Sequence, residues 1–147
     1  MLWTPDGYRL ASLNRLGAAD ALRRSASFSL SMYVAGVAAE CMLRAWHHPD
    51  RPFDERHDIV RLFHACDLDR LGDSARRRLR DPLQTIHELW QNGYRYAHDD
   101  QVRSHLHELG LDRDVHRKAD KLKVKCDELF DACAEVVSVG AARWNRN

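Results

Sequence analysis

The sequence predicts an all-α protein, an up-down bundle of four main helices plus one or two short helices. Apolar residues recur at steps of three and four along several long stretches, which is the spacing of one face of a helix. No β-branched run alternates with polar residues, so no sheet is expected. The paired prolines Pro49 and Pro52, and the turn at Gly110, mark places where helices end.

Length and composition set the broad class. The 147 residues predict a single domain spanning 1–147. The net charge of +1 excludes a general attraction to nucleic acid or membrane, so any RNA site must be a local patch. No apolar run could span a bilayer, and a cytoplasmic protein without a membrane partner is expected. The four cysteines form no Cys-x-x-Cys pair, so we expect reduced core thiols and no metal or other cofactor.

The first helix is expected over residues 8–24, with Asp6 as its N-cap. Its buried side should carry four apolar residues, Leu10, Leu13, Leu16 and Ala21. Ser25 and Ser27 then supply a break and a new helix cap.

Residues 30–46 are expected to form the central packing helix. Their apolar stripe comprises Leu30, Tyr33, Val34, Val37, Ala38, Cys41, Ala45 and Trp46. Small residues at 35, 36, 38 and 39 would let a neighbouring helix approach closely. Glu40 lies in this apolar surround, where a carboxylate is costly unless a partner neutralises it.

A short third helix is expected to start near residues 54–57 and to bury Ile59, Leu62, Phe63 and Cys66. Residues 67–73 resemble a linker. The basic segment 74–80 predicts a turn or two of helix. Asp81 and Pro82 then predict an N-cap and first residue of a new helix ending near residue 94, with Gln84 completing a capping box. Alternatively Pro82 lies within one longer helix; we favour the break.

The last long helix is expected to begin near Asp112. Its apolar residues alternate four and three along Val115, Ala119, Leu122, Cys126, Leu129, Cys133 and Val136. Such a seam indicates an intramolecular bundle face, and an intermolecular coiled coil is the alternative.

Three segments resemble the HEPN family of helical nucleotide-binding domains. They are the Ala-Ala-Glu-Cys-Met-Leu-Arg-Ala run at 38–45, the Arg-His-Asp-Ile-Val-Arg-Leu run at 56–62, and the segment from Trp90 to Arg95-Tyr96. The resemblance implies a helical bundle, often a homodimer, with a nucleotidyltransferase or another effector as a partner. Many members are metal-independent ribonucleases of bacterial toxin–antitoxin or phage-defence systems.

The family's catalytic signature is an arginine followed, after four to six residues, by a histidine. At the matching place Arg95 and His98 are separated by two residues, and on one helix they would share a face. They are the predicted catalytic pair, with His98 as general base and Arg95 facing phosphate charge. The pairs Arg51–His57 and Arg80–His87 have the family spacing but lie elsewhere in the fold.

Other residues are predicted to bind RNA or nucleotide or to shape the core. Tyr94, Tyr96 and Asp99 surround the catalytic pair. The basic block is a phosphate-binding candidate or a solvated helix face, and comprises Arg76, Arg77, Arg78 and Arg80. A metal site combining residues 98–100 with His105 or His107 is a minor alternative.

Glu40 and His57 are expected to form a buried, charge-assisted pair with a structural role, joining the second and third helices. Two functions follow from the sequence. One is a dimeric HEPN ribonuclease that acts on RNA, and the other is a non-catalytic HEPN subunit that binds RNA, a nucleotide or a partner protein.

Overall fold

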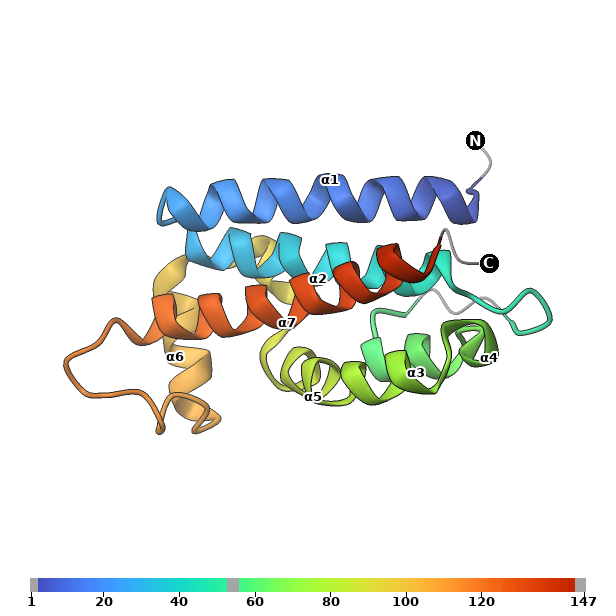
Figure 1. Ribbon diagram of the computed structural model, residues 1–147. Coiled ribbons are helices and arrows are strands. Elements are labelled where there is room, and N and C mark those ends of the chain that lie inside the picture. Colours follow the sequence, from blue (N-terminus) through green and yellow to red (C-terminus); the bar gives the residue numbers. More distant parts are fainter. Residues whose placement is uncertain (1–2, 53–55, 145–147) are drawn as a thin grey trace.

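The computed structural model describes residues 3–52 and 56–144, and four long helices dominate it. These are α1 (Pro5–Arg24), α2 (Phe28–Ala45), α5 (Asp73–Leu89) and α7 (Lys121–Trp144). Helices α1 and α5 run in one direction and α2 and α7 in the other, which confirms the up-down bundle (Figure 1). No strand occurs in the described ranges, and none of the helices there is long and apolar enough to cross a membrane.

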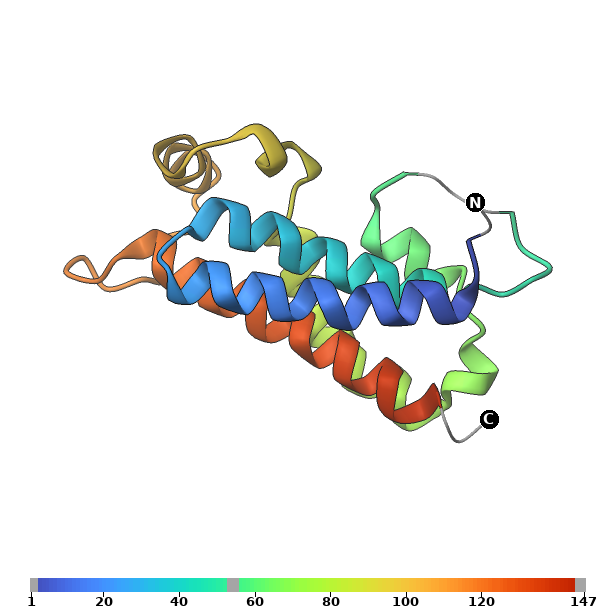
Figure 2. The same cartoon turned by 90° about the horizontal axis from the view of Figure 1, so that it is seen from above.

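Short helices are more numerous than predicted. They are α3 (Ile59–His64), α4 (Leu68–Leu71), the 3-10 helix η1 (Asn92–Tyr96) and α6 (Asp99–Glu108). Helices α3 and α4 lie at one end of the bundle, and α6 lies at the other (Figures 1 and 2). The predicted start of the third helix includes Asp54, which is outside the described residues; α3 follows Asp58, whose side chain accepts hydrogen bonds from the Val60 and Arg61 N–H groups.

Helix α2 is the central packing element, as predicted, but its buried surface is wider than the expected stripe. It packs against α1 and α7, and it also contacts α3, α6 and η1. The fully buried side chains include Met32 and Met42, whereas Leu30 is 44% exposed. Ala38, Ala45 and Trp46 of the predicted stripe are buried. A helix covered on several sides has no single buried stripe, so the prediction missed the other buried residues.

Close approach depends on the small residues of α2, as the sequence indicates. A Cβ atom at Gly36 would lie 2.0 Å from Nε1 of Trp90, so only glycine lets this indole rest on the helix. At the crossing of α2 and α7, a Cβ atom at Gly140 would lie 2.5 Å from Cγ of Met42. The Trp46 indole donates to the Gly140 carbonyl oxygen at 3.3 Å.

The predicted buried side of α1 is correct only at Leu16, which is partly buried against the core. Leu10, Leu13 and Ala21 are exposed, and the side that faces α2 carries Ser12 and Ala19. The Ser12 hydroxyl donates to the Ala38 carbonyl at 2.7 Å, and the Ser31 hydroxyl donates to the Ala19 carbonyl at 2.7 Å. Only short side chains fit a contact this close, so Leu10 and Leu13 face outward.

The N-cap of α1 also differs from the prediction. The Thr4 side chain, and not that of Asp6, accepts from the Gly7 N–H at 3.0 Å. Pro5 is the first helical residue, a position where its missing N–H costs nothing.

The predicted break at Pro82 is wrong, because α5 runs through this residue from Asp73 to Leu89. The apolar face that packs on α7 continues on both sides of it, with Leu79 and Leu83 buried. This packing offsets the hydrogen bond that proline cannot donate. Gln84 therefore caps nothing; its amide donates to Glu88 at 2.8 Å.

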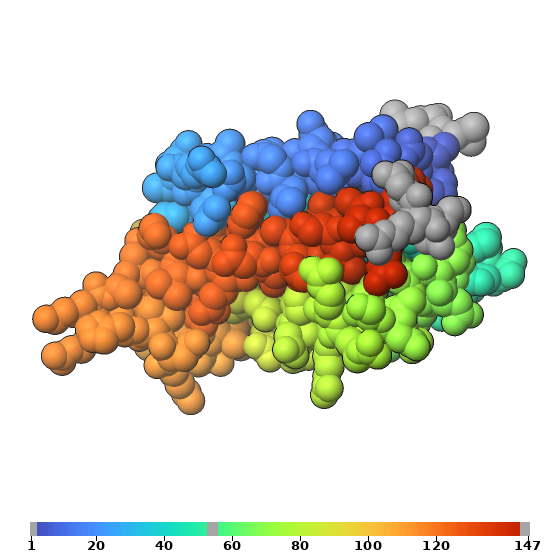
Figure 3. Space-filling model, viewed as in Figure 1, coloured from blue at the N-terminus to red at the C-terminus, as the bar shows by residue number. Residues whose placement is uncertain are grey.

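Helix α7 begins at Lys121, nine residues after the predicted start. Residues 109–120 form turns instead, and Asp120 caps the helix by accepting from the Lys123 N–H at 3.2 Å. The seam is confirmed from Leu122 to Val136 and lies inside the bundle. Figure 3 shows α7 between α1 and α5.

The four cysteines are free thiols, as expected, and Cys66, Cys126 and Cys133 are buried. Burial raises the pKa of Cys66 to about 12 and that of Cys126 to about 11. Such thiols remain protonated and unreactive near neutral pH.

Candidate functional site

The predicted pair of Glu40 and His57 is present and has a third member. Nδ1 of His57 lies 3.0 Å from both carboxylate oxygens of Glu40. Arg44, one turn further along α2, donates to Oε1 of Glu40 from Nε at 3.1 Å and from Nη2 at 2.6 Å. Glu40 and Arg44 are only 5% and 8% exposed, so the carboxylate is neutralised inside the core.

Burial separates the two ends of this network. The side chain of Glu40 is 6% exposed, whereas that of His57 is 46% exposed, so the imidazole reaches from the core to the surface. A carboxylate only accepts hydrogen bonds, and Nδ1 of His57 must therefore carry the hydrogen. This arrangement leaves Nε2 as the nitrogen that can take up or release a proton.

His57 opens into a cavity of about 300 Å³ beside the junction of α3 and α5. The cavity is also lined by Arg56, His87 at the end of α5, and the Trp90 side chain. Trp90 forms a firm wall, because its indole rests on Gly36, donates to the Tyr33 carbonyl at 3.2 Å and meets the His57 ring edge-on. The volume lies at the lower end of the range for small-molecule sites, about 300–1,000 Å³.

A second cavity, of about 420 Å³, is lined by residues of the same two helices. They are Phe63 of α3 and, from α5, Asp73 and three arginines, Arg76, Arg77 and Arg80. We call the two cavities together the α3–α5 face.

The basic block of the sequence is thus divided. Arg78 points the other way and binds Glu135 of α7, with Nη2 2.6 Å from Oε1. Successive residues of a helix are turned by about 100° around its axis. One arginine of the four therefore contacts α7, and the other three line the α3–α5 face.

Arg95 and His98 do not share a helix face, contrary to the prediction. Arg95 lies in the last turn of η1, and its guanidinium lies over the Tyr96 ring at 5.3 Å. Ala97 is extended, and His98 is the residue before α6, with its backbone N–H donating to Gln101 at 3.0 Å. His98 lines a shallow cavity of α6 to which Arg95 does not contribute.

The neighbours of this pair have varied roles. Tyr94 is 5% exposed, and burial raises its pKa to about 12, so it is a core residue and not the predicted binding residue. Asp99 accepts from the Ser29 N–H at 3.0 Å and so caps α2, whose own N-cap, Ser27, makes no side-chain bond. Tyr96, the third predicted binding residue, is 79% exposed. No three metal-ligating side chains cluster anywhere in residues 3–52 and 56–144, so the alternative metal site is not assembled.

The sequence paired Glu40 with His57, but as a buried pair with a structural role, whereas the His57 side chain is 46% exposed. It did not place His87 or Arg56 in a site. The seven-residue step from Arg80 to His87 was the available signal, since residues seven apart lie on one helix face. The sequence did not show that the segment carrying His57 lies beside α5, because this contact forms only in the folded chain.

Comparisons with protein-family models, curated proteins and solved structures found no match to this chain. Function is therefore inferred from the chemistry of the residues.

Proposed function

We propose that this protein binds RNA along the α3–α5 face and cleaves it without a metal ion, with His57 and His87 as the catalytic residues. The observation that carries this proposal is the imidazole of His57, fixed at Nδ1 by the buried carboxylate of Glu40 and open to a cavity that His87 shares. A carboxylate behind an imidazole sets its tautomer and stabilises its protonated form.

The chemistry needs one proton acceptor and one donor. Nε2 of His57 takes the proton of a ribose 2′-hydroxyl, and the 2′-oxygen attacks the adjacent phosphorus. Protonated His87 gives its proton to the departing 5′-oxygen, so that a 2′,3′-cyclic phosphate and a 5′-hydroxyl end are produced. Arg56, which lines the same cavity, faces the negative charge that grows on the phosphoryl oxygens.

Binding is assigned to the second part of the face. Arg77 and Arg80 are exposed and make no ion pair within the described residues, so both are available to phosphates. The ring of Phe63 lines the cavity beside them and offers a surface on which a base stacks.

Membership of the HEPN family, with a role in a toxin–antitoxin or phage-defence system, remains part of this proposal. The segments that carry the resemblance supply Glu40, His57 and Trp90, and the fold brings them to one site.

The second candidate function is a non-catalytic HEPN subunit that binds a nucleotidyltransferase or another effector. The exposed Tyr96 with Arg95 over its ring favours it, since such a pair is typical of a recognition surface.

A homodimer remains the predicted assembly. The alternative of an intermolecular coiled coil along α7 has no support, because the seam is buried within the bundle and the exposed positions of α7 include Lys123, Asp131 and Ser138. Exposed leucines at 10 and 13 make α1 the better candidate interface.

The decisive assay measures single-turnover cleavage of mixed cellular RNA in EDTA. His57→Gln, which can still hydrogen-bond Glu40, and His87→Ala are each expected to lower the rate at least about a hundredfold. Arg95→Ala and His98→Ala are the matched controls and should cleave like the wild type. No cleavage by the wild type, or equal cleavage by all five proteins, would refute the proposed activity.

Binding is tested separately through the divided basic block. Arg80→Ala should weaken RNA binding and lower the slope of log affinity against log salt by about 1. Arg78→Ala removes the same charge from the same helix but faces α7, so RNA affinity should hardly change. Equal losses in the two variants would show that only the overall charge of α5 matters.

A further inference from the structure

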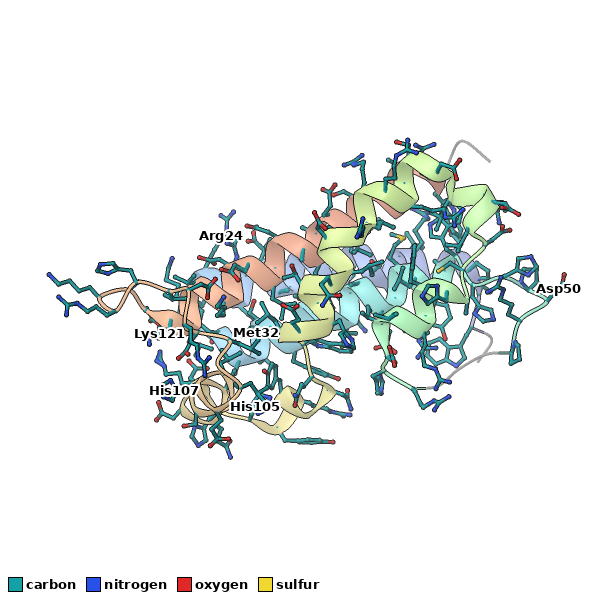
Figure 4. All side chains as sticks on the ribbon, turned by 90° about the horizontal axis from the view of Figure 1, so that it is seen from below. Arg24, Met32, Asp50, His105, His107 and Lys121 are labelled. Atoms are coloured by element: carbon teal, nitrogen blue, oxygen red, sulfur yellow. The ribbon has the colours of Figure 1, made fainter. Side chains whose placement is uncertain are left out.

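A separate cavity, of about 520 Å³, lies at the other end of the molecule, between α6, the turns at 109–120 and the start of α7. His107 and Lys121 lie side by side at this end, far from Asp50 in the loop that follows α2 (Figure 4). The proposed RNA cleavage uses none of the residues that line this cavity.

The cavity has more positive than negative charge. Three permanent cations line it, namely Arg103, Arg117 and Lys121, against the two carboxylates of Asp112 and Asp120. Arg117 makes no ion pair or hydrogen bond with any described residue.

Arg103 is only partly satisfied. Its Nη2 lies 3.4 Å from Asp120, and its buried Nε has no hydrogen-bond partner among the described residues. The Arg103 side chain is 41% exposed, so an anion in the cavity can accept hydrogen bonds from its guanidinium.

Asp112 organises the wall of the cavity. It is 5% exposed, and its Oδ2 lies 3.2 Å from Nδ1 of His107 and 3.7 Å from Nζ of Lys121. Burial alone would raise the pKa of Asp112, but the hydrogen bond from His107 and the charge of Lys121 outweigh it and lower that pKa. A buried carboxylate, ionised at neutral pH, therefore holds two donors at the cavity.

The other lining residues are Ser104, His107 and Ala119, with the buried Leu106 and Leu122 behind them. Three cations match an anionic group, and a volume of about 520 Å³ leaves room for an organic part beside it. We propose that this cavity binds a phosphate monoester, with the phosphate between Arg103, Arg117 and Lys121 and the organic part in the rest of the cavity. The site goes beyond the proposed RNA cleavage and does not depend on it.

The test is calorimetric titration of the full chain with ribose 5-phosphate, with ribose as the uncharged control. Arg117→Ala and Arg103→Ala are each expected to weaken binding of ribose 5-phosphate at least tenfold. Arg113→Ala is the matched control, because this arginine belongs to the same turns but does not line the cavity. Arg117 has no partners to lose, so its removal should leave the melting temperature unchanged.

Two sources of the phosphate are separated by a 5′-phosphorylated RNA trinucleotide and its 5′-hydroxyl form. Tighter binding of the phosphorylated trinucleotide than of ribose 5-phosphate, lost in Arg117→Ala, supports the site with an RNA end as its ligand. Equal or weaker binding supports a free small molecule. Absence of binding by every phosphate compound, or equal binding by wild type, Arg117→Ala and Arg103→Ala, overturns the proposal.

Discussion

His57 and His98 have similar neighbours in the sequence, since each is followed by an aspartate and preceded by an arginine within three residues. Their structural support differs. His57 is hydrogen-bonded to a buried carboxylate of another helix and shares a cavity with His87, whereas His98 stands at a helix start and bonds within its own turn. A catalytic imidazole needs a fixed orientation and a second functional group, and only the first cluster provides both.

The lesson of this comparison is that composition alone does not identify a site. The segment 94–100 is rich in aromatic, basic and acidic residues, yet Tyr94 is part of the core and Asp99 caps α2. The α3–α5 face instead gathers residues that are far apart in the sequence, from the segment before α3, from α3 and from α5.

The largest expected effect comes from removing the carboxylate of each cluster. Glu40→Ala strands Arg44 in the core and should lower the free energy of unfolding by about 3 kcal/mol. Asp99→Ala removes only a helix cap, and the expected loss is about 1 kcal/mol. Urea denaturation of both variants measures the difference. Equal losses would mean that the Glu40 network is no more important than a surface cap.

A glycine in each region gives the next test. Gly36→Ala forces the Trp90 indole away from α2 and should destabilise the fold by about 1–3 kcal/mol. Gly93→Ala, in η1 beside Arg95, meets no atom within 4 Å and should be close to neutral. Melting temperatures compare the two variants. A neutral Gly36→Ala would show that Trp90 is not held as firmly as its contacts indicate.

The long helices and their directions could be predicted because their apolar periodicity is local information. Which face of each helix is buried could not be predicted, since it depends on the neighbours that cover the helix. Leu10 faces solvent because the hydrogen bonds of Ser12 and Ser31 hold α1 close to α2. The predicted helix ends were wrong at two places. At Pro82 tertiary packing outweighed the local preference for a break, and residues 109–120, which are rich in charged side chains, form turns instead of helix.

The site was predictable to the extent that chemistry is visible in one segment. A lone glutamate in an apolar helix requires a partner, and this requirement led to His57. Arg44 completes the pair from the next turn of the same helix. The partnership with His87 could not be predicted, because it depends on how α3 lies against α5.

The smallest expected change in the free energy of unfolding comes from removing the charge of Asp20. This residue belongs to an ion-pair network of carboxylate and guanidinium, like Glu40 and Arg44, but it is accessible to water. Asp20 lies 2.7 Å from Arg23 and 3.0 Å from Arg24, and Arg23 also reaches Asp127 at 3.1 Å. The hydrogen bond from Arg23, together with the charge of Arg24, lowers the pKa of Asp20.

A lowered carboxyl pKa stabilises the fold above the unfolded value of about 3.9, and this contribution disappears as the pH falls through the folded value. Wild type should therefore have a slightly larger free energy of unfolding than Asp20→Asn at pH 6, and the two should converge as the pH falls through the folded pKa. Urea denaturation across this range, repeated at high salt, measures the gap, which salt should shrink because the pair is exposed. A gap that persists unchanged at low pH would show that Asp20 acts through packing and not through its charge, and the contrast with the buried Glu40 would then depend on more than access to water.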